Sequence, residues 1–178
     1  MIAEPTELEG VVRLQPAIFT DDRGSFVKTF HREQFRELGL EFEPREQFFS
    51  TSHRDVVRGM HFQIPPSDHA KLVFCLQGSV LDVVLDLRTS SPTFRKFLSC
   101  ELSDSNRFCL LIPRGCAHGF LSLTESSLVM YQTSTVHDPA RDAGVRWDSF
   151  GFIWPCASPI LSARDRAFPS LAEFVSPF

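Results

Sequence analysis

The sequence predicts a mainly β protein, a sandwich or barrel, from three observations. From residue 56 onward, short strand-like segments are separated by turn-forming residues, which is typical of these folds. In residues 80–87 every odd position is apolar, whereas Asp82 and Asp86 share the other face, which in a jelly roll can look into a ligand cavity. The chain has 178 residues without a repeat or linker, so residues 1–178 are expected to form one domain.

The predicted elements, taken in order, begin with strands at residues 11–19 and 25–30, joined by a turn at 20–25. A short helix is predicted over residues 31–40, because apolar residues recur at helical spacing and Gly39 is a stop signal. Further strands are expected at residues 46–52, 56–63, 70–77, 79–86, 95–102, 108–112, 119–123 and 127–133. Beyond Tyr131 the chain is expected to be rich in loops, with a short helix or turn at 161–165.

The composition argues against several classes of function. The formal net charge is −4, so no overall basic field recruits nucleic acid. No apolar run approaches the ~18–20 residues of a membrane span, and the first residues lack the pattern of a signal peptide. We therefore expect a cytoplasmic protein without a membrane segment. The five cysteines include no CxxC pair and are expected to be buried free thiols, with a nucleophilic Cys116 beside His118 as the alternative.

Residues 57–63 (Val-Arg-Gly-Met-His-Phe-Gln) carry many hydrogen-bonding side chains for a strand. Burying Arg58, His61 and Gln63 without partners is costly, so this strand is expected to line a polar cavity. A single histidine on a strand is more often structural than catalytic, and the neighbours of His61 therefore decide its interpretation. Tyr131 is the only tyrosine beside 18 phenylalanines, which indicates that its hydroxyl group is needed.

Metal binding is the competing use of such histidines. His118 can meet His61 in space, but the chain has no HxH pair and no apparent third ligand. We therefore expect neither a metal ion nor a cofactor.

Several blocks of sequence, found in order, closely resemble the dTDP-4-dehydrorhamnose 3,5-epimerase family. They comprise residues 58–63, 71–73, 82–88, 91–94 and 112–120, together with Gly78, Tyr131 and Trp147, within a match from about residue 9 to 169. The resemblance implies a cupin-like jelly-roll barrel with a few short helices, a homodimer and no metal. It also implies that C3, C5 or both are inverted in a nucleotide-diphosphate-linked 4-keto-6-deoxy sugar, in deoxysugar biosynthesis.

The resemblance also assigns catalytic roles. His61 is implied to be the base that takes the proton next to the ketone, which suits a group with a pKa near neutrality. Asp165 is implied to orient and polarise His61, and Lys71 to stabilise the negative charge that develops on the keto oxygen. Tyr131 is implied to return a proton on the opposite face of the sugar, through an enolate intermediate.

The substrate-binding residues implied by the resemblance are Arg23, Phe26, Lys28, Glu46, Phe48, Arg58, His118, His137 and Asp142. Arg23 and Arg58 match diphosphate-binding positions, where guanidinium groups suit phosphate oxygens, and His118 matches a sugar-contacting position. Together with Lys71, these three residues are expected to converge into a basic funnel that a partner subunit completes.

The chain departs from the usual family pattern where the substrate is expected to be selected. Lys28 replaces a Glu, Glu46 and Phe48 replace the ends of a Gln-any-Asn motif, and His137 replaces an aromatic hydroxyl. The nucleotide (dTDP, CDP or GDP) and the number of inverted centres therefore stay open. A nucleotide-sugar ketoisomerase, a non-catalytic cupin that binds a sugar nucleotide and a metal-dependent cupin oxygenase are the alternative functions.

Overall fold

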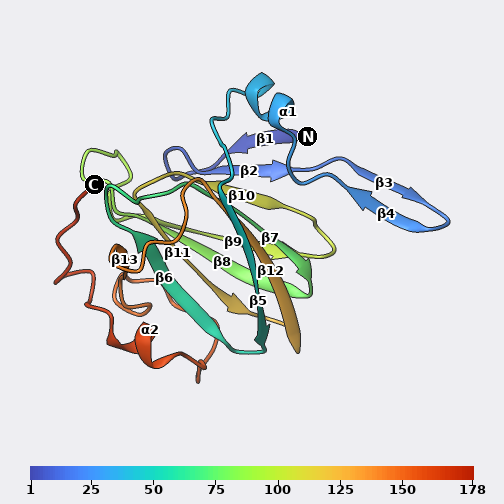
Figure 1. Ribbon diagram of the computed structural model, residues 1–178. Coiled ribbons are helices and arrows are strands. Elements are labelled where there is room, and N and C mark those ends of the chain that lie inside the picture. Colours follow the sequence, from blue (N-terminus) through green and yellow to red (C-terminus); the bar gives the residue numbers. More distant parts are fainter.

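The computed structural model describes residues 1–178 and has a body of two large antiparallel β-sheets, with a separate two-stranded hairpin and short helices at the periphery (Figure 1). The six-stranded sheet has the order β1 (Ile2–Pro5), β2 (Val12–Gln15), β10 (Cys109–Ile112), β7 (Lys71–Gln77), β12 (Ser126–Thr133) and β5 (Glu46–His53). The five-stranded sheet has the order β13 (Asp142–Gly144), β6 (Val57–Gln63), β11 (Cys116–Ser122), β8 (Ser79–Asp86) and β9 (Phe97–Ser103). This arrangement confirms the predicted mainly β jelly-roll fold.

Both faces of β8 are buried, although Asp82 and Asp86 interrupt the apolar residues on one of them. Val80 and Val84 pack into an apolar core that is shared by strands of both sheets. Val83 and Leu85 lie in a second apolar cluster together with Trp154 and other residues of the C-terminal segment. The C-terminal segment therefore covers the face of this sheet that points away from the shared core.

The predicted N-terminal helix is confirmed as α1 (Arg32–Glu37). The His31 side chain accepts a hydrogen bond from the backbone N–H of Gln34 and caps the helix. Gly39, with φ +70°, follows its last turn in the left-handed conformation that favours glycine. Phe35 of α1 is buried against Leu72 and other residues of the six-stranded sheet.

The structure corrects four elements. The strand expected at residues 11–19 is two strands, β2 and β3 (Ile18–Asp21), interrupted by Pro16, which has no N–H for a ladder. Strand β1 was not predicted, and β13 lies in the region expected to be loops. Strand β11 begins at Cys116, directly after the turn at Gly115 (φ +78°), so His118 lies within a strand and not at its entry.

A two-stranded hairpin of β3 and β4 (Gly24–Val27) projects from the body of the molecule (Figure 1). It exposes the apolar side chains of Ile18, Phe19 and Phe26. The second helix, α2 (Ala163–Ala167), lies near the C-terminus and confirms the short helix expected there. No helix of the structure combines the length and the apolar character needed to cross a bilayer.

Candidate active site

A cavity of about 370 Å³ is lined by residues of both large sheets. It brings together nine of the predicted site residues: Glu46, Phe48, Arg58, His61, Lys71, His118, Tyr131, His137 and Asp142. The remaining lining residues are Ser50, Phe62, Gln63, His69, Phe120, Thr133 and Arg164. Strands β5, β6, β7, β11 and β12 thus supply a wall of polar side chains inside an apolar barrel.

His61 lies on β6 and is hydrogen-bonded to Asp165, 104 residues away in the chain, with Nε2 2.8 Å from Oδ1. The backbone N–H of Gly59 donates to the other oxygen of Asp165, at 3.1 Å. Ser162 Oγ accepts the N–H of Asp165 as the cap of α2. The carboxylate is therefore held in place, and it orients the imidazole ring in turn.

The protonation of this pair suits a general base. Burial lowers the pKa of His61 below its ordinary value of 6.5, against the opposing effect of Asp165, so the ring is neutral at neutral pH. Burial alone raises the pKa of Asp165, but hydrogen bonds from His61 and Gly59 outweigh it and keep the pKa below its usual value. Since the carboxylate accepts from Nε2–H, Nδ1 of His61 is the nitrogen left free to take a proton.

Lys71, the first residue of β7, is almost completely buried in the cavity wall. Its Nζ donates to the backbone oxygen of His61 at 3.0 Å. Burial lowers the pKa of Lys71 to about 8, while the carboxylates of Asp142 and Asp82 favour its charged form. The ammonium group is therefore protonated at neutral pH but close to its titration.

Tyr131 lies on β12 opposite Phe48 of β5. The two rings are stacked, with centroids 4.8 Å apart and an angle of 16° between their planes. The Tyr131 hydroxyl lies 3.2 Å from Ser50 Oγ. Burial raises the pKa of Tyr131 well above its ordinary value, so the phenol remains a proton donor at neutral pH.

His118 lies on β11, opposite His61 on β6. Its Nε2 is 2.7 Å from Asp82 Oδ2, and both side chains are buried. Asp82 thus holds a residue of the cavity wall in place. This agrees with the prediction that its face of β8 points toward a cavity. Asp86 on the same face accepts hydrogen bonds from Arg88, Ser91 and Thr93 and is not a cavity residue.

Three further pairs involve residues that line the cavity. The exposed Arg58 donates to Ser52 Oγ at 2.9 Å. Asp142 forms an ion pair with Arg164 at 2.7 Å. Glu46 accepts the backbone N–H of His137 at 2.7 Å, which ties β5 to the loop after β12.

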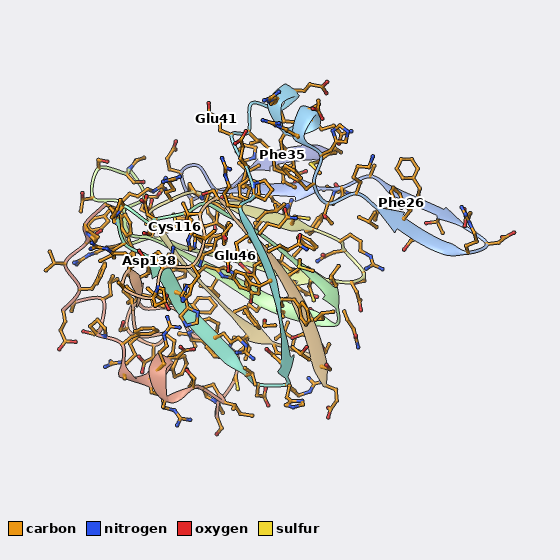
Figure 2. The ribbon with its side chains drawn as sticks, in the orientation of Figure 1. Phe26, Phe35, Glu41, Glu46, Cys116 and Asp138 are labelled. Carbon is orange, nitrogen blue, oxygen red and sulfur yellow. The ribbon has the colours of Figure 1, made fainter.

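The hairpin residues Arg23, Phe26 and Lys28 do not reach this cavity. The Arg23 side chain is 89% exposed and is paired with Asp21 of the same hairpin. Figure 2 shows Phe26 on the projecting hairpin, well away from Glu46 in the body of the barrel. Within one chain, the expected basic funnel therefore consists of Arg58, Lys71 and His118, without Arg23.

Sequence reasoning missed several residues of the site. Ser50 follows Phe48 by two positions on β5, and His69 precedes Lys71 by two. Residues two positions apart on an extended chain lie on the same side, so Phe48 and Lys71 could have indicated both residues. Arg164 is next to Asp165, but no local pattern indicates that it pairs with Asp142.

Cysteine and metal chemistry find no support in the arrangement of side chains. Burial raises the pKa of the Cys116 thiol to about 12, so it is not a reactive thiolate at neutral pH. All five cysteines are free, as predicted, but only Cys75, Cys109 and Cys116 are buried, whereas Cys100 and Cys156 are partly exposed. No group of three or more His, Cys, Asp or Glu side chains is arranged to hold a metal ion.

A jelly roll whose cavity contains polar and ionisable side chains suits an enzyme of the carbohydrate epimerase class, and comparisons with known proteins identify that class. The family model described as dTDP-4-dehydrorhamnose 3,5-epimerase matches residues 5–173. The dTDP-4-dehydrorhamnose 3,5-epimerase of Mycolicibacterium smegmatis is 42% identical over 176 residues, which cover 97% of this chain and 87% of that protein. The chain therefore belongs to the dTDP-4-dehydrorhamnose 3,5-epimerase family, and the predicted enzyme class, a carbohydrate epimerase, is confirmed.

Solved structures show the same likeness. The dTDP-4-dehydrorhamnose 3,5-epimerase of Bacillus anthracis, with TDP and PPi bound, has a TM-score of 0.93 and 36% identity, covering 96% of this chain and 99% of that one. ChmJ, a 3'-monoepimerase from Streptomyces bikiniensis in complex with dTDP-quinovose, has a TM-score of 0.89 and 34% identity, covering 94% and 87%. Proteins that are described as inverting one or two centres are thus similar to this chain to about the same degree.

Proposed function

We propose that the cavity inverts C3, C5 or both in a nucleotide-diphosphate-linked 4-keto-6-deoxy sugar by exchanging a proton between His61, the sugar and Tyr131. The observation that carries this proposal is the bond between His61 Nε2 and Asp165. It leaves Nδ1 of a neutral ring as a base inside a cavity that also contains a protonated phenol.

In the first step, Nδ1 of His61 takes the proton from the carbon next to the ketone. The electron pair of the broken C–H bond forms a C=C bond, and the carbonyl electrons move to the keto oxygen as an enolate. The ammonium of Lys71 stabilises this negative charge in a site of low dielectric constant. Asp165 stabilises the imidazolium that His61 becomes.

In the second step, Tyr131 gives its hydroxyl proton to the same carbon from the opposite face, which restores the ketone and inverts the centre. The phenolate that remains is unfavourable in this buried position, because burial raises the pKa of Tyr131. It therefore takes up a proton again, and His61 releases its own to solvent before the next turnover.

The diphosphate and the nucleoside are proposed to lie at the mouth of the cavity. Arg58 is exposed and lines the cavity, and a guanidinium suits phosphate oxygens. The bound TDP and dTDP-quinovose of the two similar structures support a nucleotide-linked substrate. Glu46, Phe48 and His137 line the same cavity and are proposed to select the substrate.

We further propose a homodimer in which the hairpin of one chain completes the cavity of its partner. Arg23, Phe26 and Lys28 are exposed at or beside the projecting hairpin and do not line the candidate active-site cavity of their own chain. The exposed apolar side chains of Phe19 and Phe26 are unusual for a surface that contacts only water. A second copy supplies both cover for these rings and a place for Arg23 beside the diphosphate.

The five free cysteines support a reducing compartment, the cytoplasm, as the location of the protein.

The test is to incubate the protein with 4-keto-6-deoxy sugars linked to dTDP, CDP and GDP in deuterated water. Nuclear magnetic resonance then locates the label and the configuration at C3 and C5. Label at an inverted centre supports the proposal and identifies both the nucleotide and the centre. Movement of the carbonyl indicates a ketoisomerase, and binding without label uptake indicates a non-catalytic cupin; either result contradicts the proposal.

A further inference from the structure

His69 is a cavity residue to which the proposed mechanism gives no role. It precedes β7, but the chain there is already extended, because Ala70 exchanges hydrogen bonds with Ser134. The Ala70 N–H donates to Ser134 Oγ at 2.9 Å, and the Ser134 N–H donates to the Ala70 oxygen at 3.0 Å. Residues two apart on extended chain lie on the same side. His69 and Lys71 accordingly both line the cavity.

Gln63 determines which nitrogen of His69 carries the proton. The Gln63 side-chain amide is fixed by backbone groups, since Nε2 donates to the Ser67 oxygen at 2.7 Å and Oε1 accepts the Asp138 N–H at 2.6 Å. The same Nε2 lies 3.1 Å from His69 Nδ1, which must therefore accept. A neutral imidazole has a single N–H, so in His69 it is Nε2–H.

This N–H group has no partner of its own. His69 Nε2 is buried and makes no hydrogen bond within the chain. Burial, together with the positive charges of Lys71 and Arg114 and the proximity of His137, lowers the pKa of His69 to about 3, so the ring stays neutral at neutral pH. A buried donor without an acceptor is unfavourable, and a ligand that brings an acceptor oxygen removes this cost.

We propose that His69 is a specificity-determining residue whose Nε2–H donates a hydrogen bond to the C3 hydroxyl of the bound sugar. This inference rests on the proposed function, which places the keto oxygen at C4 beside Lys71. The ring carbons on either side of C4 are C3, which carries a hydroxyl, and C5, which carries a methyl group. Of these two, only C3 offers His69 an acceptor. A neutral donor suits a neutral hydroxyl, whereas the charged Lys71 suits the enolate.

The experiment compares two substrates in deuterated water: the 4-keto-6-deoxy sugar nucleotide that the wild-type protein labels, and its 3-deoxy analogue. Both are assayed with the wild-type chain, His69→Phe and His69→Gln, by label uptake and by separate kcat and KM values. His53→Phe is the matched control, because His53 is exposed on β5 and lies outside the cavity. Thermal unfolding of each variant reports whether it is folded.

His69→Phe is expected to lower kcat/KM at least ten-fold for the hydroxylated substrate and less than three-fold for the 3-deoxy analogue. His69→Gln keeps an N–H donor and is expected to retain most of the wild-type preference for the hydroxylated substrate. If His69→Phe does not fold, the substrate preference of His69→Gln alone tests the role of His69. Equal losses on both substrates, or no loss, overturn the role of His69. A wild-type chain that labels neither substrate overturns the proposed function itself, and the inference with it.

Discussion

His61 and His118 lie opposite each other on neighbouring strands, and each is bound through Nε2 to its own aspartate. The side chains of both aspartates are almost completely buried, but His61 keeps 30% of its side-chain surface exposed, against 4% for His118. The two pairs are therefore not equivalent. His61 is open to the cavity, whereas His118 and Asp82 form part of its buried wall.

His61→Ala is expected to lower exchange of the substrate's α-proton with deuterated solvent by at least about a hundred-fold, because the base is removed. Its thermal unfolding is expected to stay close to that of the wild type. His53→Ala is the matched control and is expected to retain exchange, because His53 is an exposed residue of β5 outside the cavity. Full exchange in His61→Ala contradicts the assignment of the base.

Tyr131→Phe separates the two halves of the reaction. The variant keeps the ring that stacks on Phe48 but loses the hydroxyl near Ser50. Some loss of the α-proton to solvent is expected to continue, since His61 is intact, while inversion stops. Nuclear magnetic resonance of the substrate in deuterated water measures both; normal epimerisation by this variant shows that another group is the acid.

The dependence of kcat/KM on pH is expected to be bell-shaped. On the acid side, activity persists at pH 6.5 and falls as the pH drops below the lowered pKa of His61, because the protonated ring is no longer a base. On the alkaline side, activity falls as the pH rises through about 8, because Lys71 loses its charge. Initial rates between pH 4 and pH 10 measure both limbs.

Two variants assign these limbs. Asp165→Asn removes the carboxylate that raises the pKa of His61, so the acid limb moves to lower pH while the maximal rate drops. Lys71→Arg stays charged at all these pH values, so the alkaline limb near pH 8 disappears. An alkaline limb that stays near pH 8 in Lys71→Arg shows that another group titrates there.

The proposed dimer predicts complementation between two inactive variants. His61→Ala and Arg23→Ala chains are refolded together in equal amounts. In each mixed dimer, one of the two sites then combines the intact His61 of the Arg23→Ala chain with the intact Arg23 of the His61→Ala chain. About a quarter of the wild-type activity is expected, because half of the dimers are mixed. The double variant mixed with itself is the control. No recovery, despite a demonstrated mixed dimer, indicates that Arg23 does not act across subunits.

Gly59→Ala is expected to destabilise the protein by about 2 kcal/mol or more, because φ is +135° and an added Cβ would lie 2.6 Å from the Gly119 Cα. Gly39→Ala is the matched control, since its φ is also positive, at +70°, but nothing lies within 4 Å of the added Cβ. Its cost is expected to be about 1 kcal/mol. Unfolding in urea compares the two, and an equal cost for both contradicts a steric role for Gly59.

Much of the fold followed from local patterns. The alternation in β8 and the turn residues between strands predicted the later strands to within a few residues, because successive side chains of a strand point to opposite faces of the sheet. Pro16 shows the limit: the apolar pattern continues across it, yet its missing N–H separates two strands. The short β13 has too few residues to produce a pattern.

The sequence by itself determined the family and the chemical groups that are available: an imidazole, a lysine and a single phenol. Only the tertiary structure decided which groups meet, because hydrogen bonds such as that of His61 with Asp165 join residues 104 positions apart. A period of two says which side of a strand a residue faces, but not which partner lies opposite. For the same reason, only the structure placed Arg23 on a projecting hairpin and left the N–H of His69 without an acceptor.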